Sequence, residues 1–154
     1  MSVAIREATI ADAPALGAVQ MAALLAGYAE FLETTAALPG VAERVSWWRA
    51  ELELPDPRAW IAEHDGNAAG LVSVGPGELR WLCVMPERWG AGIGTALLAT
   101  AEQELPPGAT LEVPEANRRA RRLFERRGWT RGEELGQREG RVAPEVRYRL
   151  GGAA

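Results

Sequence analysis

The residues most suggestive of chemistry lie between Val84 and Thr95, where the sequence is VMPERWGAGIGT. Three glycines, Gly90, Gly92 and Gly94, occupy every second position directly before an apolar, helix-like segment. Glycine lets backbone N–H groups crowd around an anion, and the N-terminus of a helix favours negative charge. The spacing therefore predicts a loop that binds a phosphate or pyrophosphate group.

A strand and a helix must position this loop. Residues 78–84 (ELRWLCV) are bulky and compatible with β-structure, which predicts a strand that ends where the loop begins. After the loop, an apolar residue recurs at every fourth position until Pro106, at Ile93, Leu97, Ala101 and Leu105. This repeat predicts a helix with one buried face, so strand, loop and helix form a single unit.

Two common nucleotide-binding loops do not fit these residues. A Rossmann turn requires GxGxxG and an acidic residue after a following strand, whereas the sequence here is GxGxG without such a residue. A Walker loop requires a lysine before Ser or Thr, but all 17 basic residues of the chain are Arg. Neither class of nucleotide site is therefore expected.

The segment resembles the acetyl-CoA signature of the GNAT superfamily of N-acetyltransferases. In that signature a hydrophobic strand with a Val-x-Pro end leads into an (Arg or Gln)-x-x-Gly-x-(Gly or Ala) loop. Val84, Pro86 and the glycines match it, whereas Trp89 stands where Arg or Gln is usual. The resemblance implies that acetyl-CoA is the cosubstrate and is bound by Leu82, Cys83, Val84, Trp89, Gly90, Ala91, Gly92, Ile93, Gly94 and Thr95.

A second block, residues 111–129 (LEVPEANRRARRLFERRGW), resembles the family's next strand, helix and Gly-aromatic ending. Asn117 matches the asparagine that anchors the cofactor arm in the family, which implies that it also binds acetyl-CoA. Asn is equally a favoured first residue of a helix, and the two roles can coexist. The first strand and helix entry and the last strand, VRYRL, are similar as well, so the resemblance covers nearly the whole chain.

The fold that this resemblance implies is α/β (α+β) with a mixed, mostly antiparallel sheet. It has about six to seven strands, about four flanking helices, and a splay between the fourth and fifth strands. Composition agrees with one domain over residues 1–154, because a chain of 154 residues with 47% hydrophobic content can form one core without a disulfide. Local signals include a capping box at Thr9 and Asp12, a helix carrying Val41, Val45, Trp48 and Leu52, and a hairpin between residues 58–63 and 68–74.

Direct transfer of an acetyl group to an amine requires a base, hydrogen-bond donors to the thioester oxygen, and a proton for the CoA thiolate. We predict Glu78 as the base, although a solvated turn glutamate is an alternative interpretation. Phe124 stands where many family members have a tyrosine acid, so water or Tyr28 would supply the proton. A catalytically silent CoA-binding sensor is therefore the alternative function.

The acceptor is shaped in the family by the first two helices and the loop between them, which here predicts that Tyr28 and Trp48 bind substrate. Small-molecule and peptide amines both remain open. The segment 117–128 carries six arginines and one glutamate, a formal charge of +5 in a chain of net charge −4. A solvated face, ion pairs, or attraction of the 3′-phosphate of CoA explain this segment better than nucleic-acid binding.

Other residue types predict little chemistry. Cys83 is the single cysteine and His64 the single histidine, so no metal site of ordinary composition is expected. We interpret Cys83 as a core residue and His64 as part of a turn.

No signal peptide and no apolar run of about 18 residues is apparent, which favours a cytoplasmic protein without a membrane partner. The arginine bias favours a bacterial source, and exposed apolar segments with the habits of the family favour a homodimer.

Overall fold

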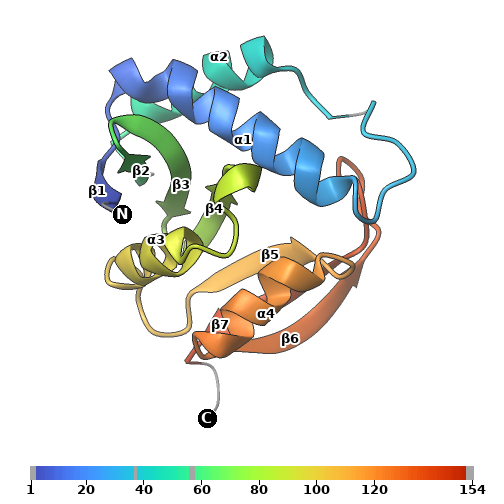
Figure 1. Ribbon diagram of the computed structural model, residues 1–154. Helices are drawn as coiled ribbons and strands as arrows, with labels where there is room; N and C mark the ends of the chain where they lie inside the picture. The colour runs from blue at the N-terminus through green and yellow to red at the C-terminus, as the bar shows by residue number, and fades with distance from the viewer. Residues whose placement is uncertain (1–2, 37, 56–57, 152–154) are drawn as a thin grey trace.

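The computed structural model describes residues 3–36, 38–55 and 58–151 (Figure 1). Within these ranges the chain forms one sheet of seven strands in the order β1-β2-β3-β4-β5-β7-β6. The strands are β1 (Val3–Glu7), β2 (Arg58–His64), β3 (Asn67–Gly75), β4 (Glu78–Val84), β5 (Thr110–Pro114), β6 (Trp129–Gly136) and β7 (Glu145–Leu150). The helices are α1 (Ala13–Tyr28), α2 (Val41–Leu52), α3 (Ile93–Glu102) and α4 (Arg118–Arg126), with single 3₁₀ turns at Ile10–Asp12 and Pro86–Arg88.

The sheet consists of two antiparallel parts that meet at β4 and β5. Strands β1 to β4 pair antiparallel in chain order, and β5, β7 and β6 form the second antiparallel part. The contact between β4 and β5 is parallel, and in the described residues its register holds one pair, Glu78 with Thr110. Beyond this pair the two strands diverge, so the predicted mixed sheet and its splay between the fourth and fifth strands are confirmed.

Helices cover both faces of the sheet (Figure 1). Leu16 and Trp48, from α1 and α2, are buried with Ile61, Leu71 and Cys83 on one face. On the other face, residues of α3 and α4 pack against the alternate strand positions, Trp60, Ala62 and Val72. Since successive side chains of a strand point to opposite faces, the nearly continuous apolar runs of β2 and β3 indicate a sheet buried on both sides.

Several local predictions hold with small shifts of boundary. Thr9 and Asp12 form the expected capping box, which leads into the Ile10–Asp12 turn and α1. The hairpin has a tighter turn than expected, because β2 and β3 extend to His64 and Asn67. His64 is therefore a buried strand residue, and its interpretation as part of a turn was wrong.

Helix α1 corrects one prediction about membranes. Residues 10–28 form a 19-residue helical segment whose mean hydropathy reaches 1.4, so the expectation that no such apolar run exists was wrong. Seven residues of α1, including Leu16, Val19 and Met21, are buried. A core helix of a globular domain has the same apolar character, and α1 packs against the sheet and α2.

Candidate functional site

The glycine loop opens the N-terminus of α3. Gly92 is the N-cap residue with φ 87°, and Gly90 has φ 82°, a backbone region that other residues rarely adopt. The N–H groups of Ile93, Gly94 and Thr95 lack intrahelical acceptors because they lie in the first turn of α3. No side chain among the described residues caps this turn, so these groups remain available to an anion. A Cβ at Gly94 would lie 3.3 Å from Leu123 of α4, so the glycine also allows close packing beneath the loop.

A cavity of about 710 Å³ lies over this loop, and we name it the glycine-loop cavity. Its wall combines α1, β4, the loop, α3 and α4. All the residues predicted to hold the cofactor line it except Ala91, which is exposed beside it. The structure therefore brings together ten of these positions: Leu82, Cys83, Val84, Trp89, Gly90, Gly92, Ile93, Gly94, Thr95 and Asn117.

Arginines line the same cavity from a second direction. Arg118, Arg122 and Arg126 come from α4 and Arg88 from the Pro86–Arg88 turn, and none of the four forms an ion pair within the described part of the chain. The three α4 residues are four positions apart, which places them on one side of the helix. This period of four is visible in the sequence and distinguishes these three residues from the other arginines of residues 117–128. The cavity thus combines free backbone amides with uncompensated positive charge.

Trp89, Arg119 and Glu30 form a bridge at the rim of the glycine-loop cavity. The Trp89 indole Nε1 donates to the Val84 carbonyl oxygen at 2.8 Å. The Arg119 guanidinium carbon lies 4.3 Å from the Trp89 ring centroid, and its Nη2 lies 3.0 Å from a Glu30 carboxylate oxygen. The indole therefore fixes the end of β4 instead of reaching toward an anion.

Asn117 occupies the junction of two cavities. Its Oδ1 accepts a hydrogen bond from the Ala120 N–H at 3.3 Å, so it caps α4 as the sequence allowed. The side chain also lines both the glycine-loop cavity and a second cavity of about 520 Å³ between β4 and β5, which we name the splay cavity. The two cavities are continuous, because the same residues line both of them: Leu24, Tyr28, Leu82, Cys83, Asn117 and Ala120.

The open edge of β4 faces this junction. The Met85 N–H donates to the Ala69 oxygen of β3 at 2.8 Å, whereas the Val84 carbonyl is bonded on the other side by Trp89. Because the backbone groups of successive strand residues point to alternate edges, the N–H groups of Leu82 and Val84 face the splay. Two directed donors are thereby available where β5 has moved away.

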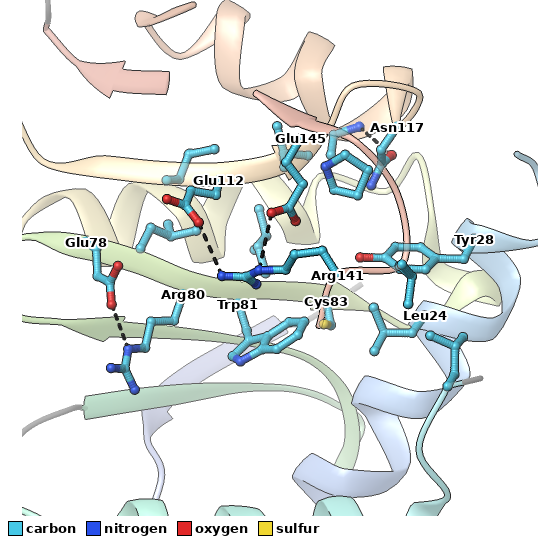
Figure 2. A pocket seen from close by; sticks show the side chains of 18 of the residues that line it. Leu24, Tyr28, Glu78, Arg80, Trp81, Cys83, Glu112, Asn117, Arg141 and Glu145 are labelled. Atoms are coloured by element: carbon cyan, nitrogen blue, oxygen red, sulfur yellow. Dashed lines mark hydrogen bonds and ion pairs between the residues drawn. The ribbon is translucent and has the colours of Figure 1, made fainter. Parts of the chain in front are cut away.

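Glu78 and Tyr28 lie at opposite ends of the splay cavity (Figure 2). A Glu78 carboxylate oxygen accepts from Arg80 Nε at 2.9 Å, and the Glu78 side chain is 43% exposed. Tyr28 is the last residue of α1, and its hydroxyl points into the cavity. Burial raises the pKa of the Tyr28 phenol to about 12, with Cys83 and Glu145 nearby adding to the effect.

Comparison with known proteins identifies the fold and the family. The family model described as "Acetyltransferase (GNAT) family" matches residues 22–129, more than half of the chain. The chain belongs to the acetyltransferase (GNAT) family. No curated protein matches it in sequence.

Solved structures show the same GNAT fold over almost the whole chain. A GCN5-related N-acetyltransferase from Rhodopseudomonas palustris superposes with TM-score 0.83 at 19% identity, over 97% of this chain and 96% of that one. PaiA N-acetyltransferase from Thermoplasma acidophilum, solved with coenzyme A, has TM-score 0.77 at 20% identity, over 97% and 100%. Apo YjaB from Escherichia coli has TM-score 0.73 at 20% identity, over 99% and 100%. At these identities the likeness concerns the fold.

One predicted site residue of this GNAT domain needs correction. Trp48 is fully buried, donates from Nε1 to Gln20 Oε1 at 2.8 Å, and lines neither cavity, so its assignment to substrate binding was wrong. Its neighbour Trp47 lines the splay cavity instead. Tyr28, the other residue predicted to bind substrate, lines both cavities from the end of α1.

Other side chains of the site have clear roles in packing. Cys83 is buried, and burial raises the pKa of its thiol to about 12, which keeps it protonated and agrees with its interpretation as a core residue. Phe124 is buried and lines the splay cavity with an apolar ring. Among residues 3–36, 38–55 and 58–151, no three His, Cys, Asp or Glu side chains are grouped as metal ligands would be.

Proposed function

We propose that this GNAT protein transfers an acetyl group from acetyl-CoA to a primary amine of a small molecule or peptide by direct attack. The observation that carries the proposal is the glycine-loop cavity. The N–H groups at the start of α3, the open edge of β4 and four arginines without an ion pair among the described residues surround one continuous space there. Coenzyme A carries a pyrophosphate and a 3′-phosphate joined to a long neutral arm. The cavity offers matching positive charge at one end and backbone donors at the other.

The residues of the chain divide this binding task. The N–H groups of residues 93–95 bind the pyrophosphate. Three arginines on α4 attract the phosphate groups of the cofactor: Arg118, Arg122 and Arg126. Asn117 binds the arm at the junction of the cavities. The N–H groups of Leu82 and Val84 then donate to the thioester oxygen, which stabilises the negative charge that develops there.

The acceptor amine enters through the splay cavity and must be neutral to attack. Glu78 takes its proton through a chain of water molecules, because Glu78 lies four positions before Leu82, roughly 13 Å away along β4. The new C–N bond forms as the C–S bond of the thioester breaks, and the thiolate leaves with the electron pair. Its proton comes from water, while Tyr28, held protonated at neutral pH, donates a hydrogen bond to the sulfur.

The test is release of free thiol from acetyl-CoA over a panel of amines. We expect amine-dependent release by the wild-type protein and a roughly 10²- to 10⁴-fold lower turnover for Glu78→Gln, with unchanged affinity for acetyl-CoA. Glu53→Gln is the matched control, since Glu53 is exposed and lines neither cavity. Equal turnover of Glu78→Gln and wild type would exclude Glu78 as the base.

A CoA-binding sensor without catalysis is the second candidate, and Phe124 favours it. The ring of Phe124 lies in the splay cavity where a hydroxyl would serve as the acid, and Tyr28 with a pKa near 12 is a poor replacement as a full proton donor. Tight acetyl-CoA binding without thiol release across the whole amine panel would favour the sensor. Saturable release with any amine would exclude it.

A further inference from the structure

Among the residues that the structure describes, one charged side chain of the splay cavity has no counter-charge. Arg80 pairs with Glu78 at 2.9 Å and with Glu51 at 3.0 Å. Across the cavity, Arg141 pairs with Glu112 at 3.3 Å and with Glu145 at 3.5 Å (Figure 2). Burial raises the pKa of Glu112, but hydrogen bonds from Arg138 and Arg147 outweigh it and hold this pKa below its ordinary value, so the Glu112 carboxylate remains ionised beside Arg141.

Arg44 is the exception. It lines the splay cavity from α2, and within the described residues it has no acidic partner within 4.0 Å. Its Nε–H is shielded from solvent and has no hydrogen-bond acceptor among these residues. The cavity therefore has an uncompensated positive charge that is partly desolvated.

Two tryptophan rings hold this guanidinium in place. The guanidinium carbon of Arg44 lies 5.7 Å from the Trp47 ring centroid and 5.4 Å from the Trp81 ring centroid. Trp47 is in turn held edge-on by the buried Trp48 at 4.9 Å. These two cation–π contacts hold the guanidinium beside the rings, and its Nη groups can then serve as the donors for a ligand.

We propose that Arg44 binds a carboxylate of the acceptor, so that the substrate is an amine that also carries a carboxylate, such as an amino acid with an apolar side chain. This inference rests on the proposed acetyl transfer for its amine. The planar guanidinium fits a carboxylate with two parallel N–H···O bonds. The apolar body of the acceptor fits the remaining wall of the cavity, which includes Leu24, Leu38, Phe124 and Val142.

The position of Arg44 separates this role from cofactor binding. Arg44 lines the splay cavity but not the glycine-loop cavity, whereas the arginines assigned to the CoA phosphates line the glycine-loop cavity. Its charge nevertheless acts on both Tyr28 and Cys83, where it opposes the rise of their pKa values. A carboxylate on Arg44 thus lies close to the junction at which the amine meets the thioester.

The experiment uses pairs of amines with and without the carboxylate: glycine, leucine and phenylalanine, each against its amide. Because the amide lowers the pKa of the α-amine, kcat/KM is expressed per neutral amine. For the wild-type protein we expect kcat/KM for the preferred free acid to exceed that of its amide by roughly ten- to hundredfold, since a hydrogen bond to a charged group has about this value. Arg44→Gln should abolish the preference by lowering kcat/KM for the acid far more than for the amide. Arg49→Gln is the control, because Arg49 is exposed on the same helix and lines neither cavity.

A binding measurement keeps this inference separate from the proposed function. The N-acetylated form of each amino acid and of its amide is titrated against wild type, Arg44→Gln and Arg49→Gln, and tryptophan fluorescence reports on Trp47 and Trp81. Tighter binding of the acids that is lost in Arg44→Gln alone supports the inference even if no acetyl transfer occurs, in which case the proposed function fails. Equal binding of acids and amides to the wild-type protein, or a preference that survives in Arg44→Gln, would overturn it.

Discussion

Replacement of Gly92 by alanine should weaken acetyl-CoA binding by a predictable amount. Gly92 is the N-cap residue of α3 with φ 87°, and a Cβ built there meets no atom within 4 Å. Backbone strain is therefore the energetic cost of the added methyl group, since it makes no steric clash. A left-handed conformation costs an L-residue about 1–2 kcal/mol. The exposed loop can relax in the free protein, and binding must then restore the strained conformation. The dissociation constant should rise about five- to thirtyfold.

Gly128→Ala is a closely matched control. Gly128 follows α4 with φ 90°, a Cβ there also meets no atom within 4 Å, and the residue lines neither cavity. At this connection, between α4 and β6, the strain persists in the folded protein, which should lower Tm by about 2–8 °C. Its affinity for acetyl-CoA should be that of the wild type.

Calorimetric titration with acetyl-CoA and thermal unfolding of the free protein together give the two quantities. We expect Gly92→Ala to lose affinity and Gly128→Ala to lose stability. If both variants bind acetyl-CoA as tightly as the wild type, the glycine loop does not hold the phosphate groups in the conformation described.

Three further predictions concern the core and the first turn. Trp48→Phe removes the hydrogen-bond donor to buried Gln20 and should lower the free energy of unfolding, measured by denaturant titration, by about 2–4 kcal/mol. The affinity for acetyl-CoA should not change. Full stability together with weaker acceptor binding would contradict this prediction. Cys83, with a thiol pKa raised to about 12, should resist alkylation at pH 8 until the protein is unfolded, and rapid native labelling would refute its burial. A hydrogen bond from Arg6 lowers the pKa of Asp12 to about 2, so its carboxylate stabilises the protein above pH 3.8 and loses this effect as pH falls toward 2. The Tm deficit of Asp12→Asn should therefore be present at pH 6 and vanish near pH 2, and a deficit independent of pH would exclude this ion pair as its cause.

The parts of the site that were predictable depend on local signals. The glycine spacing and the apolar i, i+4 repeat fix the strand, loop and helix from Glu78 onward, and the observed β4 has the predicted bounds. The apolar repeat predicts the C-terminal end of the helix less accurately, because α3 ends at Glu102 and not at Leu105. Such patterns are local because turn chemistry and helix capping act over a few residues.

The error at Trp48 has a physical origin in the same kind of pattern. Trp48 belongs to the repeat of Val45 and Leu52, and that repeat marks the side of α2 that faces the core. Trp47 lies about 100° further around the helix and lines the splay cavity. The periodicity was therefore better evidence for a buried Trp48 than for a substrate contact.

The charged lining of the cavities was only partly predictable. The period of four at Arg118, Arg122 and Arg126 indicates one helix side, but the cavity that this side borders depends on how α4 packs against β4 and the glycine loop. The contact between Arg44 and Trp81 joins α2 to β4 and depends on tertiary packing. No local sequence signal predicts such a pair.

The most direct test is a calorimetric titration of the wild-type protein with acetyl-CoA, with acetyl-3′-dephospho-CoA as the reference ligand. We expect saturable binding at one site per chain, with weaker binding of the dephosphorylated ligand because the arginines of α4 lose one phosphate partner. Absence of any binding of acetyl-CoA would contradict the assignment of the glycine-loop cavity and, with it, the proposed acetyl transfer.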